Sequence, residues 1–338
     1  MSAGLEYRVA IREAIDEEMA RDERVIMFGE DVAAAGGVFN VTPGLMATHG
    51  RERVFDTPIS ELAIASGAFG AAVSGLRPVI EIMFGDFLPL AMDSLVNQAA
   101  KYWFISNEQA SVPLVVRSAV GAGGRFGAIH SQIPVSWFQG VPGIKIVAPA
   151  TSGDAKALLK AAIRDDNPVL FLEHKRLYSV KDPPPETELL EIGKASVARE
   201  GADLTIVSVS KGVRDALAAA EQLASEHGIE AEVVDLRSLR PVDVDTVLES
   251  VAKTNRVLAV EEGPRTGGWA TGLLGAISES ALHDLDDAWI IATGDAPIPY
   301  SPPLEDAFLP DPPGIVAEVV GRLRENAVAA SELSAPVT

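Results

Sequence analysis

VIEIMF, residues 79–84, is a short and mostly apolar run, and four similar runs occur between residues 25 and 172. They are VIMF (25–28), PLVV (113–116), IKIV (144–147) and VLFL (169–172). Runs of this length and spacing are typical of buried parallel strands. Helical patterns lie between them, including one that Ser152 is expected to cap and whose apolar face includes Leu158 and Leu159. The alternation predicts an α/β fold with a mostly parallel sheet.

A second α/β series follows an interruption rich in proline and acidic residues. Pro183, Pro184 and Pro185 cannot continue a helix or enter a central strand, so residues 181–200 are predicted to be a linker. Beyond it we expect strands at 204–209, 233–236 and 257–260, with helices over 212–227 and 242–253. The sequence therefore predicts two domains, 1–180 and 201–338, each a mostly parallel sheet flanked by helices.

Composition narrows the possible partners. The 338 residues carry a formal net charge of −20, which argues against nucleic acid or an anionic membrane as the main partner. The chain has no cysteine, which excludes disulfides, zinc–thiolate sites and cysteine nucleophiles. We find neither a signal peptide pattern nor an apolar run long enough to span a bilayer, and we expect a cytoplasmic protein.

GAGGRFGAIHSQ, residues 121–132, is the most unusual loop of the first domain. Its glycines suggest a phosphate-binding loop, but the dinucleotide fingerprint needs glycine where Phe126 stands, and no Gly-Lys-Ser/Thr triplet follows. Two interpretations remain: a flexible surface turn, or a backbone shaped around a cofactor or substrate with His130 at its edge. The loop follows a predicted strand, which favours the second, because ligands of open α/β sheets gather at the carboxyl ends of strands. Of the five histidines, only His130 has such a position.

Residues 56–75 form a second unusual stretch, made largely of alanine, glycine and serine after Glu61. A helix with such small side chains allows another helix or a subunit to approach closely. Glu61 in its first turn has two possible roles. It either complements the positive end of the helix dipole or is a half-buried carboxylate that bonds a cofactor at a subunit interface.

Nine segments together resemble one known family. They are GEDV (29–32), FDTPISE (55–61), EIMFGDF (81–87), HSQ (130–132), PGIKIVAP (142–149), AAIRDDNPVLFLEHK (161–175), LRSLRPVD (236–243), EEGPRTGG (261–268) and IPYSPPLEDAFLP (298–310). In this order they resemble the beta subunit of the thiamine diphosphate-dependent, decarboxylating first component of 2-oxo acid dehydrogenase complexes. That family includes the pyruvate, branched-chain and acetoin dehydrogenases and is related to transketolase. The resemblance implies a transketolase-like pyrimidine-binding domain followed by a transketolase C-terminal-like domain.

The resemblance also assigns residues. Glu61 would bond ring nitrogen N1′ of thiamine diphosphate and favour the tautomer that removes the thiazolium C2 proton. Phe87 and Ile59 would pack beside the pyrimidine, and His130 would act in acid–base steps and in acyl transfer to a lipoyl group. A structural potassium ion is implied as well. Its ligands would be the carbonyls of Leu114, Ala162 and Ile163, with Asp165 and Asn167.

The family's diphosphate and Mg²⁺ segment, GDG…N, belongs to an alpha subunit, and this chain has no GDG. The resemblance therefore implies activity only with an alpha partner, in an assembly of two alpha and two beta chains. The second domain would serve beta–beta association and docking to the lipoyl acyltransferase core.

Residues 133–138 depart from the family's common form, so pyruvate, a branched-chain 2-oxo acid and acetoin all remain open as substrates. Alternatives are an acetoin dehydrogenase beta subunit, a self-sufficient transketolase-like half, and a non-catalytic scaffold. A Rossmann dehydrogenase lacks its fingerprint here.

Overall fold

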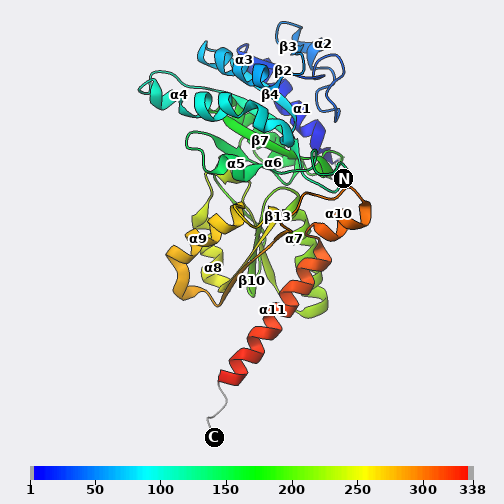
Figure 1. The fold of residues 1–338 in the computed structure, drawn as a ribbon, viewed down its shortest axis with the longest axis vertical. Helices are drawn as coiled ribbons and strands as arrows, with labels where there is room; N and C mark the ends of the chain where they lie inside the picture. Colours follow the sequence, from blue (N-terminus) through cyan, green and yellow to red (C-terminus); the bar gives the residue numbers. More distant parts are fainter. Residues whose placement is uncertain (1–3, 334–338) are drawn as a thin grey trace.

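The computed structural model describes residues 4–333, so the outermost residues of both predicted domains lie outside it. Within that range the predicted α/β architecture is confirmed, with one sheet in the upper half of Figure 1 and another in the lower half. The first sheet has the strand order β12-β6-β7-β5-β4-β2-β3. Its strands are β2 (Val25–Gly29), β3 (Val54–Asp56), β4 (Arg77–Phe84), β5 (Val115–Val120), β6 (Lys145–Val147), β7 (Val169–His174) and β12 (Ser238–Arg240). All neighbours pair in parallel except β12, which runs antiparallel to β6.

Helices cover both faces of this sheet. α1 (Tyr7–Arg21) and α6 (Ser152–Arg164) pack together on one face, and α3 (Glu61–Val73) lies on the other with the short helices η1 (Gly85–Ala91) and η2 (Asp93–Ala99). The remaining elements of this half are α2 (Leu45–His49), α4 (Ala100–Ile105), α5 (Val135–Gln139), η3 (Lys175–Leu177) and a small pair formed by β1 (Leu5–Glu6) and β8 (Lys181–Asp182).

The second sheet has the order β14-β13-β10-β11-β9. Its strands are β9 (Ser196–Arg199), β10 (Leu204–Ser208), β11 (Ala231–Asp235), β13 (Arg256–Pro264) and β14 (Asp287–Thr293), and only β9 is antiparallel. The helices of this half are α7 (Lys211–Gln222), η4 (Leu223–His227), α8 (Val244–Thr254), α9 (Trp269–Ala281), η5 (Leu282–Asp284), α10 (Pro302–Phe308) and α11 (Pro312–Leu333). No helix among residues 4–333 has the length and apolar character needed to cross a bilayer.

Some local details differ from the sequence-based predictions. Thr151, not Ser152, caps α6, because its hydroxyl accepts the Asp154 amide at 3.1 Å. Ser152 is the first helical residue and instead bonds Asp182. The segment predicted as a linker contains β8 and β9, and β12 crosses from the second series to the edge of the first sheet.

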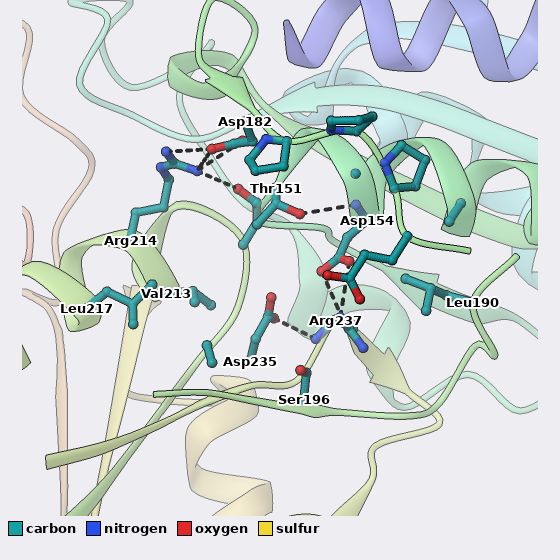
Figure 2. Close-up of a pocket in the computed structure, with 18 of the residues that line it drawn as sticks. Thr151, Asp154, Asp182, Leu190, Ser196, Val213, Arg214, Leu217, Asp235 and Arg237 are labelled. Carbon is teal, nitrogen blue, oxygen red and sulfur yellow. Dashed lines mark hydrogen bonds and ion pairs between the residues drawn. The ribbon is translucent and has the colours of Figure 1, made fainter. Parts of the chain in front are cut away.

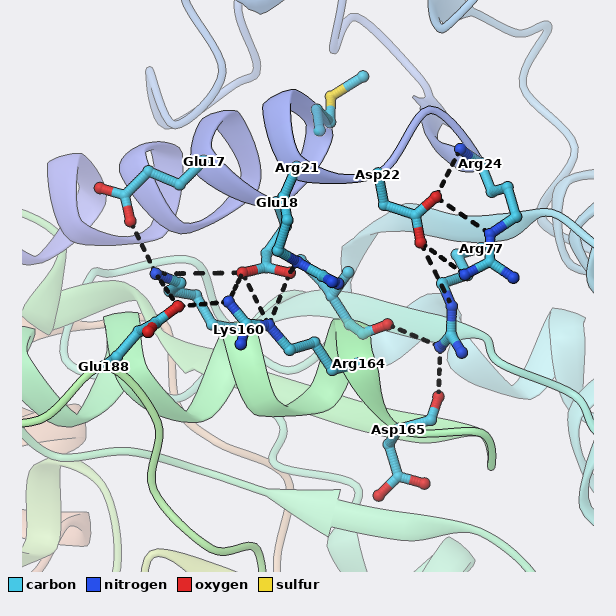
Figure 3. A network of polar contacts seen from close by, with 12 residues as sticks. Glu17, Glu18, Arg21, Asp22, Arg24, Arg77, Lys160, Arg164, Asp165 and Glu188 are labelled. Carbon is cyan, nitrogen blue, oxygen red and sulfur yellow. Dashed lines mark hydrogen bonds and ion pairs between the residues drawn. The ribbon is translucent and has the colours of Figure 1, made fainter.

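Charged side chains fasten α1 to α6 (Figure 3). Glu18 is fully buried and accepts hydrogen bonds from Arg164 and Arg21. Lys160 on α6 reaches Glu17 at 2.9 Å, and Glu188 from the connecting segment joins Arg164. This network anchors the segment after β8 to the outer face of the first domain.

A buried arginine crosses the centre of the first sheet. Arg117 on β5 is 1% exposed and donates to both carboxylate oxygens of Glu173 on β7, at 2.7 and 2.8 Å. Its third bond goes to Glu81 on β4 at 2.7 Å, and the hydroxyl of Tyr178 adds a bond to Glu173. The carboxylates raise the pKa of Arg117 despite its burial, so the guanidinium stays charged. Three adjacent strands are thus joined by charge as well as by backbone.

We predict that Arg117→Met lowers the free energy of unfolding by about 3–5 kcal/mol, because it leaves buried carboxylates without a cation. A urea titration measures the change. Arg265→Met, at an exposed position, should shift the value by less than about 0.5 kcal/mol. Adding Glu81→Gln and Glu173→Gln to Arg117→Met should restore part of the lost free energy of unfolding, because the two buried carboxylates are then neutral. If Arg117→Met matched the exposed control, the network would not stabilise the sheet.

Candidate active site

His130 lies in the long connection between β5 and α5, at the carboxyl edge of the first sheet. Two phenylalanines meet its ring edge-on: Phe84, at the end of β4, with ring centres 4.7 Å apart, and Phe87, on η1, at 5.4 Å. Phe87 and His130, predicted from separate segments, are therefore neighbours. The aromatic rings fix the orientation of the imidazole, since edge-to-face packing is directional.

Glu61 begins α3, behind the cap formed by Ser60. Its side chain is buried, at 8% exposure, yet it makes no hydrogen bond or ion pair with any residue described by the structure. Burial raises the pKa of nearby Glu30, and the Glu61 and Asp31 carboxylates add to the effect. The two oxygens of Glu61 do not belong to the buried polar atoms that lack a partner, so solvent reaches them, and they can receive a hydrogen-bond donor from outside the chain.

Ile59 lies two residues earlier and is 82% exposed. None of the hydrophobic clusters formed by the described residues includes Ile59. Leu62 and, across the surface, Trp103 and Phe104 are exposed as well. The small-residue face of α3 is also uncovered, since Gly67 and Gly70 have no atoms within contact distance of an added Cβ.

Lys175 was not found from the sequence and lies beside His130. Its ammonium donates to the backbone carbonyl of His130 and sits 5.2 Å from the ring centres of both Phe84 and Phe126. Burial lowers its pKa to about 8, although the carboxylates of Asp86, Glu262 and Glu305 oppose the shift. The position could have been inferred, because Lys175 directly follows β7, whose carboxyl end meets those of β4 and β5.

His174 was set aside in the sequence comparison of histidines but also borders this site. Its Nδ1 accepts the Arg176 amide at 3.1 Å, so the ring proton resides on Nε2 and is donated to Glu262 at 3.0 Å. Burial would raise the pKa of Glu262, but His174 and the Ala122 amide outweigh it and lower that pKa. Glu262 comes from β13, so the second domain contributes to the same cluster.

Several buried polar atoms near the carboxyl edge have no partner among the described residues. They include Thr57 Oγ1, Asp86 Oδ2 and Ser131 Oγ. The other oxygen of Asp86 accepts from Gln132, which links the segment carrying Phe87 to the one carrying His130. Unsatisfied polar atoms beside Glu61 and His130 in sequence fit a site that a polar cofactor or water completes.

Four of the predicted potassium ligands belong to the end of α6 and the turn after it, and the fifth, Leu114, precedes β5 and pairs with Val169 just beyond that turn. The carbonyl of Leu114 accepts from Val169, and that of Ala162 accepts from Asp165. Arg77 donates to the carbonyls of Ile163 and Asp165, each at 3.1 Å, and Lys145 pairs with the Asp165 carboxylate (Figure 3 shows Arg77 and Asp165). Asn167 donates its side-chain amide to Asp165, and its side-chain oxygen accepts no hydrogen bond from residues 4–333. The oxygen donors fit a hard monovalent cation, but Arg77 and Lys145 already supply positive charge there.

A separate cleft of about 700 Å³ lies between the two domains under the proline run (Figure 2). Asp235 is 3% exposed within it, and burial raises its pKa to about 7. Arg214 pairs with Asp182, and Arg237 with Asp154. These pairs fasten the linker and α6 to the second domain. None of the predicted site residues lines this cleft, so the candidate active site is elsewhere.

Comparison with known proteins identifies the family of this two-domain fold. Residues 3–181 match the transketolase pyrimidine-binding domain, and residues 193–315 match the transketolase C-terminal domain. The beta subunit of acetoin:2,6-dichlorophenolindophenol oxidoreductase from Cupriavidus necator is 44% identical, over 94% of this chain and 97% of that protein.

Two further relatives and one solved structure are also similar to this chain. The 2-oxoisovalerate dehydrogenase beta subunit of Bacillus subtilis is 44% identical (93% and 97% covered), and the pyruvate dehydrogenase E1 component beta subunit of Rhizobium meliloti is 43% identical (95% and 70% covered). A structure described as a split gene transketolase, inactive beta4 tetramer, shares the fold with a TM-score of 0.78 at 24% identity, covering 94% of this chain and 98% of that one. The chain therefore belongs to the transketolase-like family of 2-oxo acid dehydrogenase beta subunits, whose members serve pyruvate, branched-chain and acetoin dehydrogenases.

Proposed function

We propose that the chain provides the aminopyrimidine half of a thiamine diphosphate site that an alpha subunit completes, in a 2-oxo acid dehydrogenase that passes an acyl group to a lipoyl acyltransferase core. The observation that carries the proposal is the carboxylate of Glu61, which bonds no described residue and begins α3, a helix whose small-residue face is uncovered. The bound cofactor would supply a carbon nucleophile for the 2-oxo carbon.

The residues of this chain have distinct roles in the proposal. Glu61 accepts a hydrogen bond from the aminopyrimidine ring, and Phe87 and Ile59 provide its apolar contacts. His130 moves a proton through its ring nitrogens near the reacting carbon. Lys175 holds the backbone of His130, and Phe84 holds its ring.

Two features support an alpha partner. The chain lacks the GDG segment that would hold the diphosphate and Mg²⁺. It also exposes large apolar side chains near Glu61 and on α4, including Ile59, Leu62, Trp103, Phe104 and Ile105, as expected of an interface that another subunit covers. We propose an assembly of two alpha and two beta chains, with the second domain serving beta–beta contact and core docking. The cytoplasmic location stays a prediction.

The substrate class we propose is a 2-oxo acid. The three relatives above are 43–44% identical, so identity does not rank pyruvate, a branched-chain 2-oxo acid and acetoin. Co-purification with a candidate alpha chain from the same organism, followed by an artificial-acceptor assay on each of the three compounds, tests the function. An assembled complex that oxidised only acetoin would favour the acetoin dehydrogenase alternative, and one inactive on all three would favour a scaffold.

Glu61→Ala in the assembled enzyme should weaken thiamine diphosphate binding and lower kcat by about 100-fold or more. His130→Ala should reduce acyl transfer to lipoamide more than it reduces cofactor affinity. Titration calorimetry and a lipoamide assay measure these quantities. Glu52→Ala, at an exposed position in the same domain, is the control. Full activity and affinity in Glu61→Ala would refute its role.

Lys175 gives a pH prediction. Its folded pKa of about 8 lies below the ordinary 10.5, so between these values the unfolded chain binds more protons and this group's contribution to stability rises with pH. The interaction of Lys175 with the His130 loop, in contrast, weakens as the pH rises. Deprotonation above pH 8 removes the positive charge beside the Phe84 and Phe126 rings. Lipoamide-transfer activity should therefore decline above about pH 8.

Lys175→Arg should remove this alkaline decline, since a guanidinium keeps its proton. Lys101→Arg, on the exposed side of α4, should leave it unchanged. Identical pH profiles for wild type and Lys175→Arg would show that another group causes the decline.

We also propose that potassium binds the turn at Leu114, Ala162, Ile163, Asp165 and Asn167. Replacing Na⁺ by K⁺ at constant ionic strength should raise the melting temperature by about 2–4 °C for each kcal/mol of binding energy. Asn167→Ala should abolish the difference between the two salts. Equal melting temperatures for the wild type in both salts would mean that Arg77 and Lys145 suffice to neutralise the turn.

A further inference from the structure

The glycine-rich loop before His130 binds anions that come from its own chain. Its backbone takes positive φ angles at Gly121, Gly123, Arg125 and Gly127, which turns successive amides outward. The amide of Ala122 donates to Glu262 at 2.6 Å. The amides of Gly123 and Arg125 donate to the two oxygens of Glu305, at 2.9 and 3.2 Å. The loop therefore has the geometry of an anion cradle, filled by carboxylates.

Glu305 is the central group of this contact. It lies in the first turn of α10 in the second domain and is 0% exposed. Besides the two amides it accepts the guanidinium of Arg125 at 2.7 Å. Arg125 also donates to the carbonyl of Pro302 and to Asp306, at 3.0 and 2.9 Å. Arg125 is a non-glycine residue with φ of +64°, a conformation that needs such support.

Two glycines of the loop are closely packed against other segments. A Cβ on Gly121 would lie 2.1 Å from Nε2 of His174, and one on Gly127 would lie 2.6 Å from Cδ2 of Tyr300. His174 is itself held by Glu262. Beyond the loop, Lys175 binds the carbonyl of His130. The segment that presents His130 is thus fixed at its start by the second domain and at its end by the first.

We propose that Glu305, assisted by Glu262, is a positioning residue for His130: its carboxylate is an internal anion that fixes the glycine-rich loop, and so couples the interdomain contact to the active site. Glu305 does not touch the reacting atoms and acts through the loop. The consequence for catalysis rests on the proposed function, whereas the effect on the loop does not.

The test removes the carboxylate and then supplies another. Glu305→Ala is prepared as the full chain and in the assembly with the alpha subunit. The substitution removes the three hydrogen bonds that Glu305 accepts from the Gly123 amide, the Arg125 amide and the Arg125 guanidinium. Amide hydrogen exchange of residues 121–132 and trypsin cleavage after Arg125 measure how much the loop loosens. We expect exchange at 122–125 to accelerate by about tenfold or more. Acetate should restore protection, and chloride at equal ionic strength should not.

Two variants provide controls. Asp306→Asn, one residue further on α10, removes only an exposed ion pair with Arg125 and should leave loop exchange as in the wild type. Glu305→Gln keeps the shape of the side chain without its charge and should fall between wild type and Glu305→Ala. In the assembly, Glu305→Ala should lower kcat for lipoamide transfer more than it weakens cofactor binding.

The proposal would be overturned if the loop amides of Glu305→Ala exchanged at the wild-type rate. It would also be overturned if the exchange rates of β4, β5 and β7 rose as much as those of the loop, because that would signal general destabilisation. Restoration by chloride as well as by acetate would also overturn it. An inactive wild-type assembly would refute the proposed function alone, because exchange and cleavage are measured without turnover.

Discussion

The buried ion network of Arg117 is the interaction on which the candidate site depends. It joins β4, β5 and β7 through Glu81 and Glu173 at the centre of the first sheet. The same three strands end in Phe84, in the loop that leads to His130, and in His174 followed by Lys175. A parallel sheet brings these ends to one edge, and the shared guanidinium stabilises their alignment. The buried charge of Arg117 therefore supports the position of the site residues through the strands, because its own hydrogen bonds go to Glu81 and Glu173.

A second constraint is that the site is divided between domains. Residues of the first sheet supply the aromatic and imidazole rings, while Glu262 and Glu305 of the second domain occupy the loop amides. The loop therefore resembles a phosphate cradle in its glycines and in its backbone amides, yet its anions are the protein's own carboxylates. A cofactor's diphosphate would have to displace two carboxylates from that loop, which supports the proposal that another subunit holds the diphosphate.

The sequence predicted much of the fold because its information is local. Apolar runs marked β2, β4, β5, β6 and β7, and Gly228 marks the end of its helix with φ of +65°. The sequence could not predict that β12, which follows the strands of the second domain, pairs with β6 of the first sheet. Pairing at the edge of a sheet depends on how the two domains pack together. Ser152 was taken for a cap because the hydroxyls of Thr151 and Ser152 are equivalent in sequence, and only the contact with Asp182 distinguishes them.

For the site, the segments around Glu61, Phe87 and His130 were sufficient to name candidates, because their order along the chain is characteristic of the family. Lys175 was missed because its environment is made by Phe84, Phe126 and the His130 carbonyl, which come from elsewhere in the chain. The sequence by itself determined the alternation of strands and helices, the acidic surface and a glycine-rich loop able to bend. Only the tertiary structure decided what that loop binds, because Glu262 and Glu305 stand 140 and 182 residues beyond their amide partners and reach them only when the two domains pack together.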